Sequence, residues 1–331
     1  MKAIVYTRFG EPEVLQEQEV ARPVPGDGQV LVEVRASSLN VTEIKQFAQQ
    51  IEQGTLSPVM KAMGKFALGI VGEVPGNDVA GVVVEVGAGA TRFKKGDEVF
   101  GFPVRDRGAW AEYVCADEGM LELKPAGASF EEAACLPVAG SVALAAVRKA
   151  GVRAGQSVLV HGASGGVGHL ALQIAKAHGA SVTAVCGTRN VELAYELGAD
   201  RVVDYRKDDV AQAGGAYDAV IAVNGYCPLP TIKGLLVDGG TSVFVGGEGR
   251  AIVDGLLGPI LSIGSGRRLT SVVYASIRGQ GLDWLARALG GGQVRPVLDG
   301  VFPLGEAPQA IRKVVAEHAR GKTALVAAFG A

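Results

Sequence analysis

Residues 157–168 read Ser-Val-Leu-Val-His-Gly-Ala-Ser-Gly-Gly-Val-Gly, and this stretch decides the fold. Its first four residues predict a buried strand over 157–160, and the amphipathic segment 168–178 predicts a helix. The glycines between them allow a tight turn, and they let the backbone approach a pyrophosphate at the helix N-terminus, where N–H groups are unpaired. We therefore predict a dinucleotide site whose pyrophosphate contacts Ser164, Gly165, Gly166 and Val167. A glycine-rich βα turn without a ligand is the alternative interpretation.

Strands and helices alternate through the region that follows this loop. The further predicted strands are apolar throughout and occupy 181–185, 201–204, 218–223, 241–245 and 269–274. Helical patterns at 168–178, 191–197 and 229–236 separate the first of them. Because strands without a polar face must be covered on both sides, this pattern predicts an α/β protein with a doubly wound parallel sheet.

The first third of the chain has a different pattern. Short apolar runs at 2–6, 29–36, 79–86 and 98–100 are bounded by Gly, Pro and Asp, which predicts a β-rich domain. This pattern ends near Lys124-Pro125. Ser129, with Glu131 and Glu132 after it, then marks a capped helix start, and apolar residues continue at helical spacing over 133–150. At the end of the chain, a helix over 307–318 and a strand over 323–327 are expected to return to the first domain.

Composition and charge limit the kinds of molecule that this protein is expected to bind. The chain has 331 residues, of which 48% are hydrophobic, and this size predicts two well-packed domains. Its 32 Lys and Arg nearly balance its 34 Asp and Glu. The resulting net charge of −2 argues against nucleic acid and against an anionic membrane surface as partners. We expect a small, uncharged molecule as the substrate.

The cysteines and the search for targeting signals indicate the cellular compartment of the protein. The four cysteines stand singly at Cys115, Cys135, Cys186 and Cys227, without the spacing of a disulfide framework. The first residues lack the long apolar core of a signal peptide, and no apolar run is long enough to span a bilayer. We therefore expect reduced thiols and a cytoplasmic location.

The end of the second strand of the parallel sheet distinguishes between nicotinamide cofactors. An acid in this position would hydrogen-bond the adenosine ribose, but the chain runs Gly187-Thr188-Arg189-Asn190. A hydroxyl and a guanidinium suit a 2′-phosphate, so we predict NADPH, bound by Thr188 and Arg189. Tyr205, after the third strand, is a further candidate for a contact with adenine. The alternative for Arg189 and Tyr205 is a solvated surface position.

Several motifs in order along nearly the whole chain resemble the medium-chain dehydrogenase/reductase superfamily, in its quinone oxidoreductase-like branch. They are Asn77-Asp78-Val79-Ala80-Gly81, Gly96-Asp97-Glu98-Val99-Phe100-Gly101, Gly108-Ala109-Trp110-Ala111-Glu112-Tyr113-Val114, the glycine loop and Leu197-Gly198-Ala199-Asp200. The resemblance implies a discontinuous GroES-like catalytic domain, placed at 1–123 and 276–331, and a Rossmann domain at 124–275. It also implies a homodimer joined through edge strands of the Rossmann sheets.

The resemblance also shows which zinc ligands are missing. Zinc-dependent members hold the catalytic metal with a cysteine and a His-Glu pair, and the corresponding positions here are Asn40 and Asn77-Asp78. The chain passes from Gly101 to Gly108 without the four cysteines of the structural zinc lobe. Because zinc needs about four N, S or O ligands, we predict an enzyme without a metal.

The resemblance places Asn40 close to the nicotinamide and the substrate, as the candidate catalytic residue; a turn residue after the strand is the alternative. The carboxyl ends of later strands are where ligands bind in doubly wound sheets, which predicts a nicotinamide site at Val223, Asn224, Gly246 and Gly247. The expected function is NADPH-dependent reduction of quinones or α,β-unsaturated carbonyl compounds. The alternatives are a zinc-independent carbonyl or alcohol oxidoreductase and a non-catalytic NADPH-binding protein.

Overall fold

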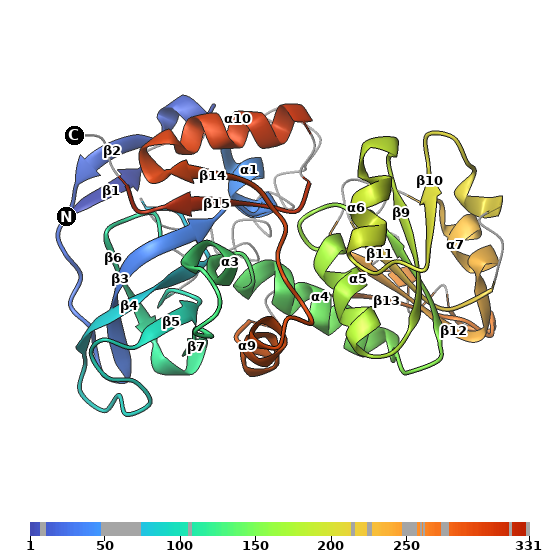
Figure 1. Ribbon diagram of the computed structural model, residues 1–331, viewed down its shortest axis with the longest axis horizontal. Helices are drawn as coiled ribbons and strands as arrows, with labels where there is room; N and C mark the ends of the chain where they lie inside the picture. Colours follow the sequence, from blue (N-terminus) through green and yellow to red (C-terminus); the bar gives the residue numbers. More distant parts are fainter. Residues whose placement is uncertain are drawn as a thin grey trace. The chain divides into compact units, whose positions relative to one another are not determined.

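The computed structural model describes residues 1–6, 11–47, 74–104, 108–212, 216–223, 227–246, 257–258, 260, 262–272, 278–317 and 320–328. The chain divides into two compact units, which are drawn in Figure 1. Unit 1 comprises Met1–Val138, Arg278–Gly290 and Pro296–Ala331, and unit 2 comprises Ala139–Ile277 and Gly291–Arg295. The last part of the chain thus lies in the same unit as its first part.

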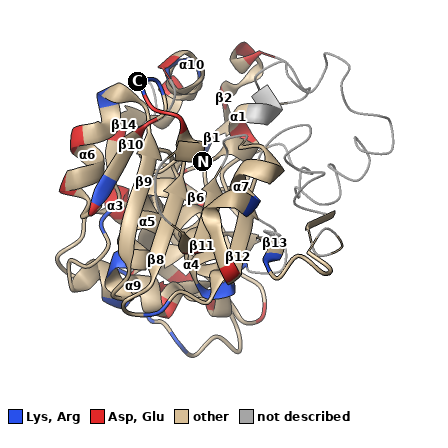
Figure 2. Ribbon diagram, turned by 90° about the vertical axis from the view of Figure 1, so that its right-hand side faces the viewer, with Lys and Arg blue, Asp and Glu red and all other residues tan. Residues whose placement is uncertain are grey.

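Unit 2 contains a parallel sheet. Its described strands are β8 (Ser157–His161), β9 (Ser181–Cys186), β10 (Arg201–Asp204), β11 (Tyr217–Val223), β12 (Leu236–Val245) and β13 (Arg268–Val272). They are arranged in the order β10-β9-β8-β11-β12-β13, with every neighbouring pair parallel (Figure 2). The order reverses beside β8, so the switch point of the sheet lies between β8 and β11, where doubly wound folds bind ligands. The predicted doubly wound fold is confirmed.

Helices of unit 2 connect these strands. They are α4 (Pro137–Ala150, whose first two residues belong to unit 1), α5 (Gly168–Ala177), α6 (Val191–Glu196) and α7 (Leu229–Leu235). Strand residues pack with α7 in a core that includes Leu159, Val220, Phe244 and Ile232. Burial of these side chains from both sides of the sheet explains why the strands lack a polar face.

The helical pattern that starts at Ser129 is interrupted. Ser129 and Glu132 form a capping box at the start of α3 (Phe130–Ala134), as the sequence indicates. α3 then ends, and a second helix, α4, begins at Pro137. Proline lacks an N–H group and is tolerated in the first turn of a helix but not in its interior, so two helices replace the continuous pattern.

Unit 1 is β-rich. Its described strands are β1 (Lys2–Val5), β2 (Gln16–Glu19), β3 (Gln29–Ser38), β4 (Val79–Val86), β5 (Glu98–Gly101), β6 (Tyr113–Asp117), β7 (Leu121–Leu123), β14 (Leu298–Pro303) and β15 (Lys322–Val326). The main sheet has the order β14-β15-β3-β4-β5-β7, with β6 paired to β3. Its helices include α1 (Val41–Phe47), α9 (Leu282–Gly290) and α10 (Ala307–Glu317). Valines of β3, β4 and β5 form its core, among them Val32, Val83 and Val99.

The last strand inserts into the sheet of the first domain. β15 pairs antiparallel with β3, with Leu325 opposite Ser37 and Ala324 opposite Ser38. The pairing continues beyond β3, where the Leu39 N–H donates to the Thr323 carbonyl at 2.9 Å. The start of β15 is thereby fixed beside the end of β3, which is the arrangement that forms the site below.

The division into units differs from the predicted domains at 124–138. This segment was assigned to the second domain, but it belongs to unit 1 because α3 packs against β3 and β4. The short segment Gly291–Arg295 belongs instead to unit 2. The Gln173 side chain on α5 binds its backbone, donating to the Arg295 carbonyl at 3.0 Å and accepting from the Arg295 N–H at 2.9 Å.

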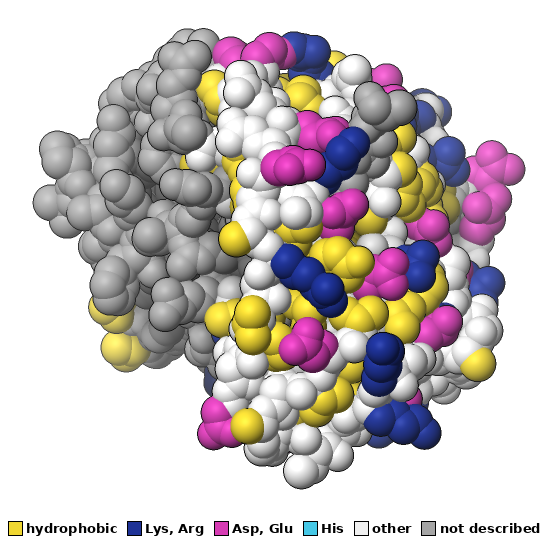
Figure 3. Space-filling model, turned by 90° about the vertical axis from the view of Figure 1, so that its left-hand side faces the viewer, with side chains coloured by type: hydrophobic (Ala, Val, Ile, Leu, Met, Phe, Trp, Pro, Cys, Tyr) yellow, Lys and Arg dark blue, Asp and Glu magenta, His cyan; other side chains and the backbone are white. Residues whose placement is uncertain are grey.

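The surface matches the near-neutral composition. On the face of the molecule shown in Figure 3, acidic and basic side chains are interspersed among hydrophobic ones.

The strand β2 is not predicted by the sequence pattern, since its four residues are polar and exposed. It is held by its pairing with β1 and by an ion pair of 3.2 Å between Lys2 Nζ and Glu17 Oε1. Among the described residues, no helix is both long and apolar enough to cross a membrane.

Candidate functional site

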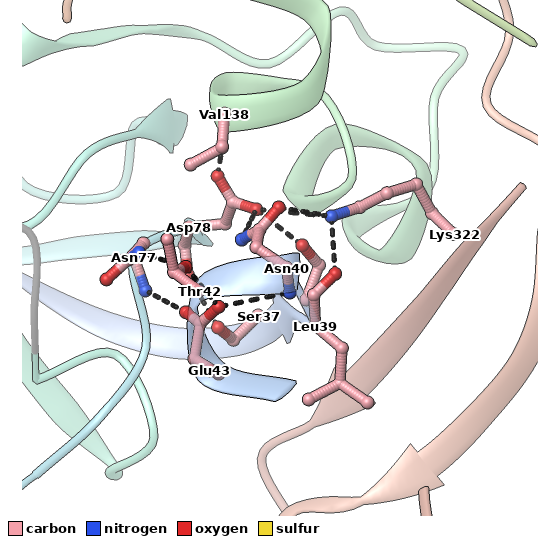
Figure 4. Close-up of polar contacts among 10 residues, drawn as sticks. Ser37, Leu39, Asn40, Thr42, Glu43, Asn77, Asp78, Val138 and Lys322 are labelled. Carbon is pink, nitrogen blue, oxygen red and sulfur yellow. Dashed lines mark hydrogen bonds and ion pairs between the residues drawn. The ribbon is translucent and has the colours of Figure 1, made fainter. Parts of the chain in front are cut away.

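A buried polar cluster lies where three strands of unit 1 begin or end (Figure 4). Asn40 follows β3, Asp78 precedes β4, and Lys322 is the first residue of β15. Glu43 joins them from α1. The exposed fractions of these four residues are 6% for Asn40, 0% for Asp78, 3% for Lys322 and 2% for Glu43. Polar groups buried to this extent must satisfy one another.

The side-chain amide of Asn40 is held at both ends. Its Oδ1 accepts from Lys322 Nζ at 2.6 Å, and its Nδ2 donates to Asp78 Oδ2 at 2.9 Å. An ammonium only donates and a carboxylate only accepts. The two charged partners therefore determine which end of the amide is oxygen and which is nitrogen. Sequence reasoning selected Asn40 but did not anticipate that its amide would be held in this way.

Asp78 connects the cluster to the start of α4. Its Oδ1 accepts from the Val138 N–H at 2.8 Å, and its Oδ2 accepts from the Ser38 hydroxyl and lies 3.7 Å from Lys322 Nζ. A carboxylate that lies at the N-terminus of a helix is favoured by the helix dipole. Together with Lys322, this stabilises a charge that has no contact with solvent.

Glu43 bridges the segments after β3 and before β4. Its Oε2 accepts from the Asn40 N–H at 3.1 Å and from the Thr42 hydroxyl at 2.9 Å, and its Oε1 accepts from the Asn77 N–H at 3.2 Å. Burial, and then the negative charge of Asp78, raise the pKa of the Glu43 carboxyl to about 7. The sequence pattern did not single out Glu43 or Lys322.

The chemistry of this cluster does not suit zinc. Oxygen atoms of Asn40 and Asp78 already face an ammonium, which would repel a second cation. Burial raises the pKa of the neighbouring Cys135 thiol to about 12, so this sulfur stays protonated. Across the described ranges, no three His, Cys, Asp or Glu side chains come together in a way that could hold a metal ion.

Unit 1 also has a shallow hollow of about 490 Å³ that does not include the cluster. Its lining contains several carboxylates, and three of them already have partners. Glu33 pairs with Arg35 at 3.2 Å, Glu98 pairs with Lys124 at 3.0 Å, and Glu112 accepts from a backbone N–H. We therefore assign no function to this hollow.

The predicted glycine loop joins β8 to α5 in unit 2. Gly162 has a φ of +76°, and a Cβ there would lie 2.3 Å from the Val223 carbonyl oxygen. A Cβ on Gly168 would lie 2.0 Å from the Gly162 carbonyl oxygen, whereas one on Gly165 would have only an ordinary contact of 3.7 Å. No side chain caps the N-terminus of α5. This leaves backbone N–H groups and open space where a pyrophosphate would fit.

The loop contacts the segment that follows β9. Ser164 Oγ accepts from Asn190 Nδ2 at 3.0 Å. Asn190 was not among the predicted site residues, although it directly follows Arg189. The contact shows that the predicted pyrophosphate loop and the predicted 2′-phosphate segment lie beside each other within unit 2.

Thr188 has a partner that the sequence did not indicate. Its hydroxyl donates to Asp204 Oδ2, at the end of β10, at 2.7 Å. This hydrogen bond, followed by others that include the Arg206 N–H, holds the pKa of the Asp204 carboxyl below its usual range. The region therefore contains an acid after all, on the neighbouring strand rather than at the end of β9. Lys207 Nζ lies 3.7 Å from the same carboxylate.

The other predicted contacts of the adenosine half lie at the same edge of the sheet. Arg189 is exposed in the 3-10 turn Thr188–Asn190. Tyr205 is 53% exposed, and its hydroxyl would be 3.2 Å from a Cβ on Gly187. Arg206 lies over the same glycine. Two cationic side chains, Lys207 and Arg206, lower the pKa of the Asp204 carboxyl by their charge, and Arg189 directly follows Thr188, which binds this carboxylate.

Residues predicted for the nicotinamide half are only partly described. Val223 ends β11 and pairs with Val245 of β12, so Val223 and Gly246, which has a φ of +64°, are close together at the carboxyl edge. Asn224 and Gly247 lie outside the described residues. His161 Nδ1, at the end of β8, is buried without a partner among the described residues, and burial lowers the pKa of this imidazole. It is therefore a neutral residue at neutral pH.

Comparisons with known proteins agree with this architecture. Residues 26–126 match the family described as alcohol dehydrogenase GroES-like domain, and residues 197–325 match the family described as zinc-binding dehydrogenase. The chain is 32% identical to the chloroplastic quinone-oxidoreductase QR1 of Triphysaria versicolor, over 97% of both proteins. It is 34% identical to a chloroplastic NADPH-dependent alkenal/one oxidoreductase of Arabidopsis thaliana, over 98% of this chain and 79% of the relative.

A solved structure, the quinone oxidoreductase from Coxiella burnetii, superposes with a TM-score of 0.83 at 30% identity and covers 99% of both chains. The two family models and the relatives span the β-rich unit and the parallel-sheet unit alike. The chain belongs to the medium-chain dehydrogenase/reductase superfamily, in its quinone oxidoreductase-like branch.

Proposed function

We propose that this chain is an NADPH-dependent oxidoreductase that transfers hydride to quinones or α,β-unsaturated carbonyl compounds without zinc. The observation that carries the proposal is the similarity, over 97–98% of the chain, to relatives named quinone oxidoreductase and NADPH-dependent alkenal/one oxidoreductase. Both names describe the reduction of a conjugated acceptor.

The residues of unit 2 fit a nicotinamide dinucleotide. The N-terminus of α5 and the loop residues Ser164, Gly165, Gly166 and Val167 bind the pyrophosphate. Val223 and Gly246 line the nicotinamide half. Asn224 and Gly247, which lie outside the described residues, stay predicted members of the same site. When bound, the cofactor supplies the hydride.

The preference for NADPH over NADH rests on charge. A 2′-phosphate beside Thr188 would meet one carboxylate, Asp204, and three cations, Arg189, Arg206 and Lys207. The cations outnumber the acid, so the local charge favours the phosphate. The bond of Thr188 to Asp204 makes Arg189, rather than Thr188, the main discriminating residue. Tyr205 then covers the adenine.

Independence from zinc is supported by the cluster of unit 1. An ammonium lies against Asn40 and Asp78, at the positions where zinc-dependent members carry metal ligands. A conjugated acceptor needs no Lewis acid, since its π system delocalises the charge that the hydride brings. We assign to Asn40 a hydrogen bond to the acceptor oxygen as this charge develops.

A second candidate is a carbonyl or alcohol oxidoreductase, because residues 197–325 match a family described as zinc-binding dehydrogenase. Alcohol oxidation requires that a proton leave together with the hydride, and zinc normally assists this step by lowering the pKa of the bound alcohol. The absence of a suitable ligand set in the cluster favours the conjugate reduction.

The test is a steady-state comparison with chelator-treated protein. NADPH-driven reduction of a 1,4-quinone and of an alkenal should exceed NADP-driven oxidation of butanol in kcat/KM, and metal analysis should find no stoichiometric zinc. Faster butanol oxidation, or activity that is lost with a chelated zinc ion, would replace the proposal with the second candidate. NADPH binding without turnover of any acceptor would indicate a non-catalytic binding protein.

We further propose a cytoplasmic homodimer joined through edge strands of the unit 2 sheet. In the described part of this sheet the edges are β10 and β13. The four cysteines are free thiols, which agrees with a reducing compartment. Sedimentation of the purified chain at twice its mass of 34.0 kDa tests the dimer.

A further inference from the structure

Lys322 is a buried ammonium that the proposed reaction does not yet use. It lies 3% exposed at the start of β15 and donates to the Leu39 carbonyl at 2.6 Å and to Asn40 Oδ1 at 2.6 Å. It also forms an ion pair with Asp78, whose Oδ2 lies 3.7 Å from Nζ, and its charge acts on the buried Glu43. Burying an ion pair is costly unless its geometry is good, and neutral groups of similar size often stabilise a fold equally well.

Strand pairing alone explains the position of β15. Its residues 324–326 form the ladder with β3, and the Leu39 N–H bonds the Thr323 carbonyl. A neutral side chain at position 322 would keep both of these features. The ammonium adds its contacts with the Leu39 carbonyl, with Asp78 and with the side-chain amide of Asn40, and only the last of these acts on a residue of the proposed reaction.

We propose that Lys322 is a positioning residue which, together with Asp78, locks the Asn40 amide in the orientation that the reduction uses. The proposal rests on the function proposed above, in which Asn40 bonds the acceptor oxygen. It concerns the partners of Asn40, not a further contact with substrate or cofactor.

The lock acts through the two ends of the amide. The amide oxygen faces Lys322 and the amide nitrogen faces Asp78. A rotation of the amide by 180° would place its NH2 group against the ammonium, where two donors meet, and its oxygen against the carboxylate, where two acceptors meet. Nδ2 carries two protons, and Asp78 accepts one of them. The second has no acceptor among the described residues, and the lock keeps it available as a donor in one direction.

The ammonium also polarises this donor. A charge-assisted hydrogen bond to the amide oxygen draws electron density from the nitrogen, which makes the second Nδ2 proton a stronger donor. Donors that are aligned in advance with a developing oxyanion are the ones that lower a barrier. Asp78 accepts the other Nδ2 proton and so fixes the orientation of the amide, and because its charge is opposite to that of Lys322, the pair adds no net charge to the site.

The experiment compares wild type with Lys322→Met and with the double variant Lys322→Met/Asp78→Asn. The single variant leaves Asp78 buried without its cation and is therefore at risk of misfolding. The double variant removes both charges together and keeps the volumes similar. Lys95→Met, at an exposed lysine of the same unit, is the matched control.

Three measurements are made on each folded variant. They are kcat and KM for a quinone and an alkenal, the Kd for NADPH, and the side-chain amide signals of Asn40 in the nitrogen-15 NMR spectrum, identified by their loss in Asn40→Ala. The amide signals report the lock whether or not the protein turns over substrate. The failure of the proposed function is thereby distinguished from the failure of this inference.

We expect the double variant to fold, to bind NADPH as wild type does, and to lose on the order of tenfold to a hundredfold in kcat with a smaller change in KM. Its Asn40 amide signals should shift or broaden, and Lys95→Met should match wild type in every respect. Wild-type kcat in the double variant, or unchanged Asn40 amide signals, would overturn the inference. A wild-type enzyme that reduces neither acceptor would instead overturn the proposed function.

Discussion

At the scale of single residues, Arg189 should decide between the two nicotinamide cofactors. It is exposed after β9, in a region where cations outnumber the carboxylate of Asp204. A hydrogen bond to a charged group contributes about 1.5–3 kcal/mol, so Arg189→Ala should raise the Kd for NADPH about tenfold to a hundredfold and leave that for NADH nearly unchanged. Titration of both cofactors measures this, with Arg153→Ala, an exposed arginine of unit 2, as control. Equal weakening of both cofactors would make Arg189 a structural residue.

Glu43 should make the stability of unit 1 depend on pH. The fold raises the pKa of this carboxyl from 4.5 to about 7, so the folded state holds the proton more tightly than the unfolded state does. Its stabilising effect is therefore complete below pH 4.5 and is lost as the pH rises through about 7. The loss in free energy of unfolding is about 3 kcal/mol.

The change Glu43→Gln removes this titration. Between pH 5 and pH 8, wild type should lose more free energy of unfolding than the variant does. Both tryptophans, Trp110 and Trp284, belong to unit 1, so their fluorescence during urea titration reports the unfolding of unit 1. Glu11→Gln, at an exposed glutamate, is the control and should keep the wild-type slope. Identical slopes for wild type and Glu43→Gln would contradict the role assigned to Glu43.

At the scale of elements, two glycines of the loop between β8 and α5 should have different roles, one in packing and one in ligand binding. A Cβ on Gly168 would be 2.0 Å from the Gly162 carbonyl oxygen, so Gly168→Ala should move α5 away from β8 and reduce both stability and cofactor affinity. A Cβ on Gly165 has only an ordinary contact of 3.7 Å. Gly165→Ala should therefore keep the stability of the protein without cofactor and weaken NADPH binding, because the methyl group occupies the space of the pyrophosphate.

Thermal unfolding without ligand, combined with NADPH titration, distinguishes these two effects. Gly234→Ala, where a Cβ on α7 has no neighbour within 4 Å, is the matched control in unit 2. If Gly165→Ala bound NADPH as wild type does, the loop would be an ordinary βα turn, which is the alternative interpretation of the sequence.

At the scale of the whole molecule, the fold brings together residues from distant parts of the chain. Lys322 and Asn40 are separated by 282 positions, yet their side chains are 2.6 Å apart. They meet because β15 returns to pair with β3 and so makes unit 1 discontinuous. Unit 2 is almost continuous, and its glycine loop comes from one stretch of sequence.

The sequence by itself determined the elements of the parallel sheet and the position of the glycine loop. Periodicity, glycine and proline are local signals, and strands β9 to β11 lie within one residue of their predicted bounds at each end. The pattern over 133–150 wrongly indicated one continuous helix, because α3 ends at Ala134 and a second helix, α4, begins at Pro137. Asn40 was selected through a family resemblance, which gave its position but not its contacts.

Only the tertiary structure decided the partners of the site residues. That Asp204 accepts from Thr188 depends on which strand lies beside β9, and that Lys322 holds the Asn40 amide depends on where the last strand pairs. A lysine that begins a strand has the same local pattern whether it faces water or a buried carboxylate. The difference is made by the order of the strands, because strand order brings charges from distant positions into one region of low dielectric.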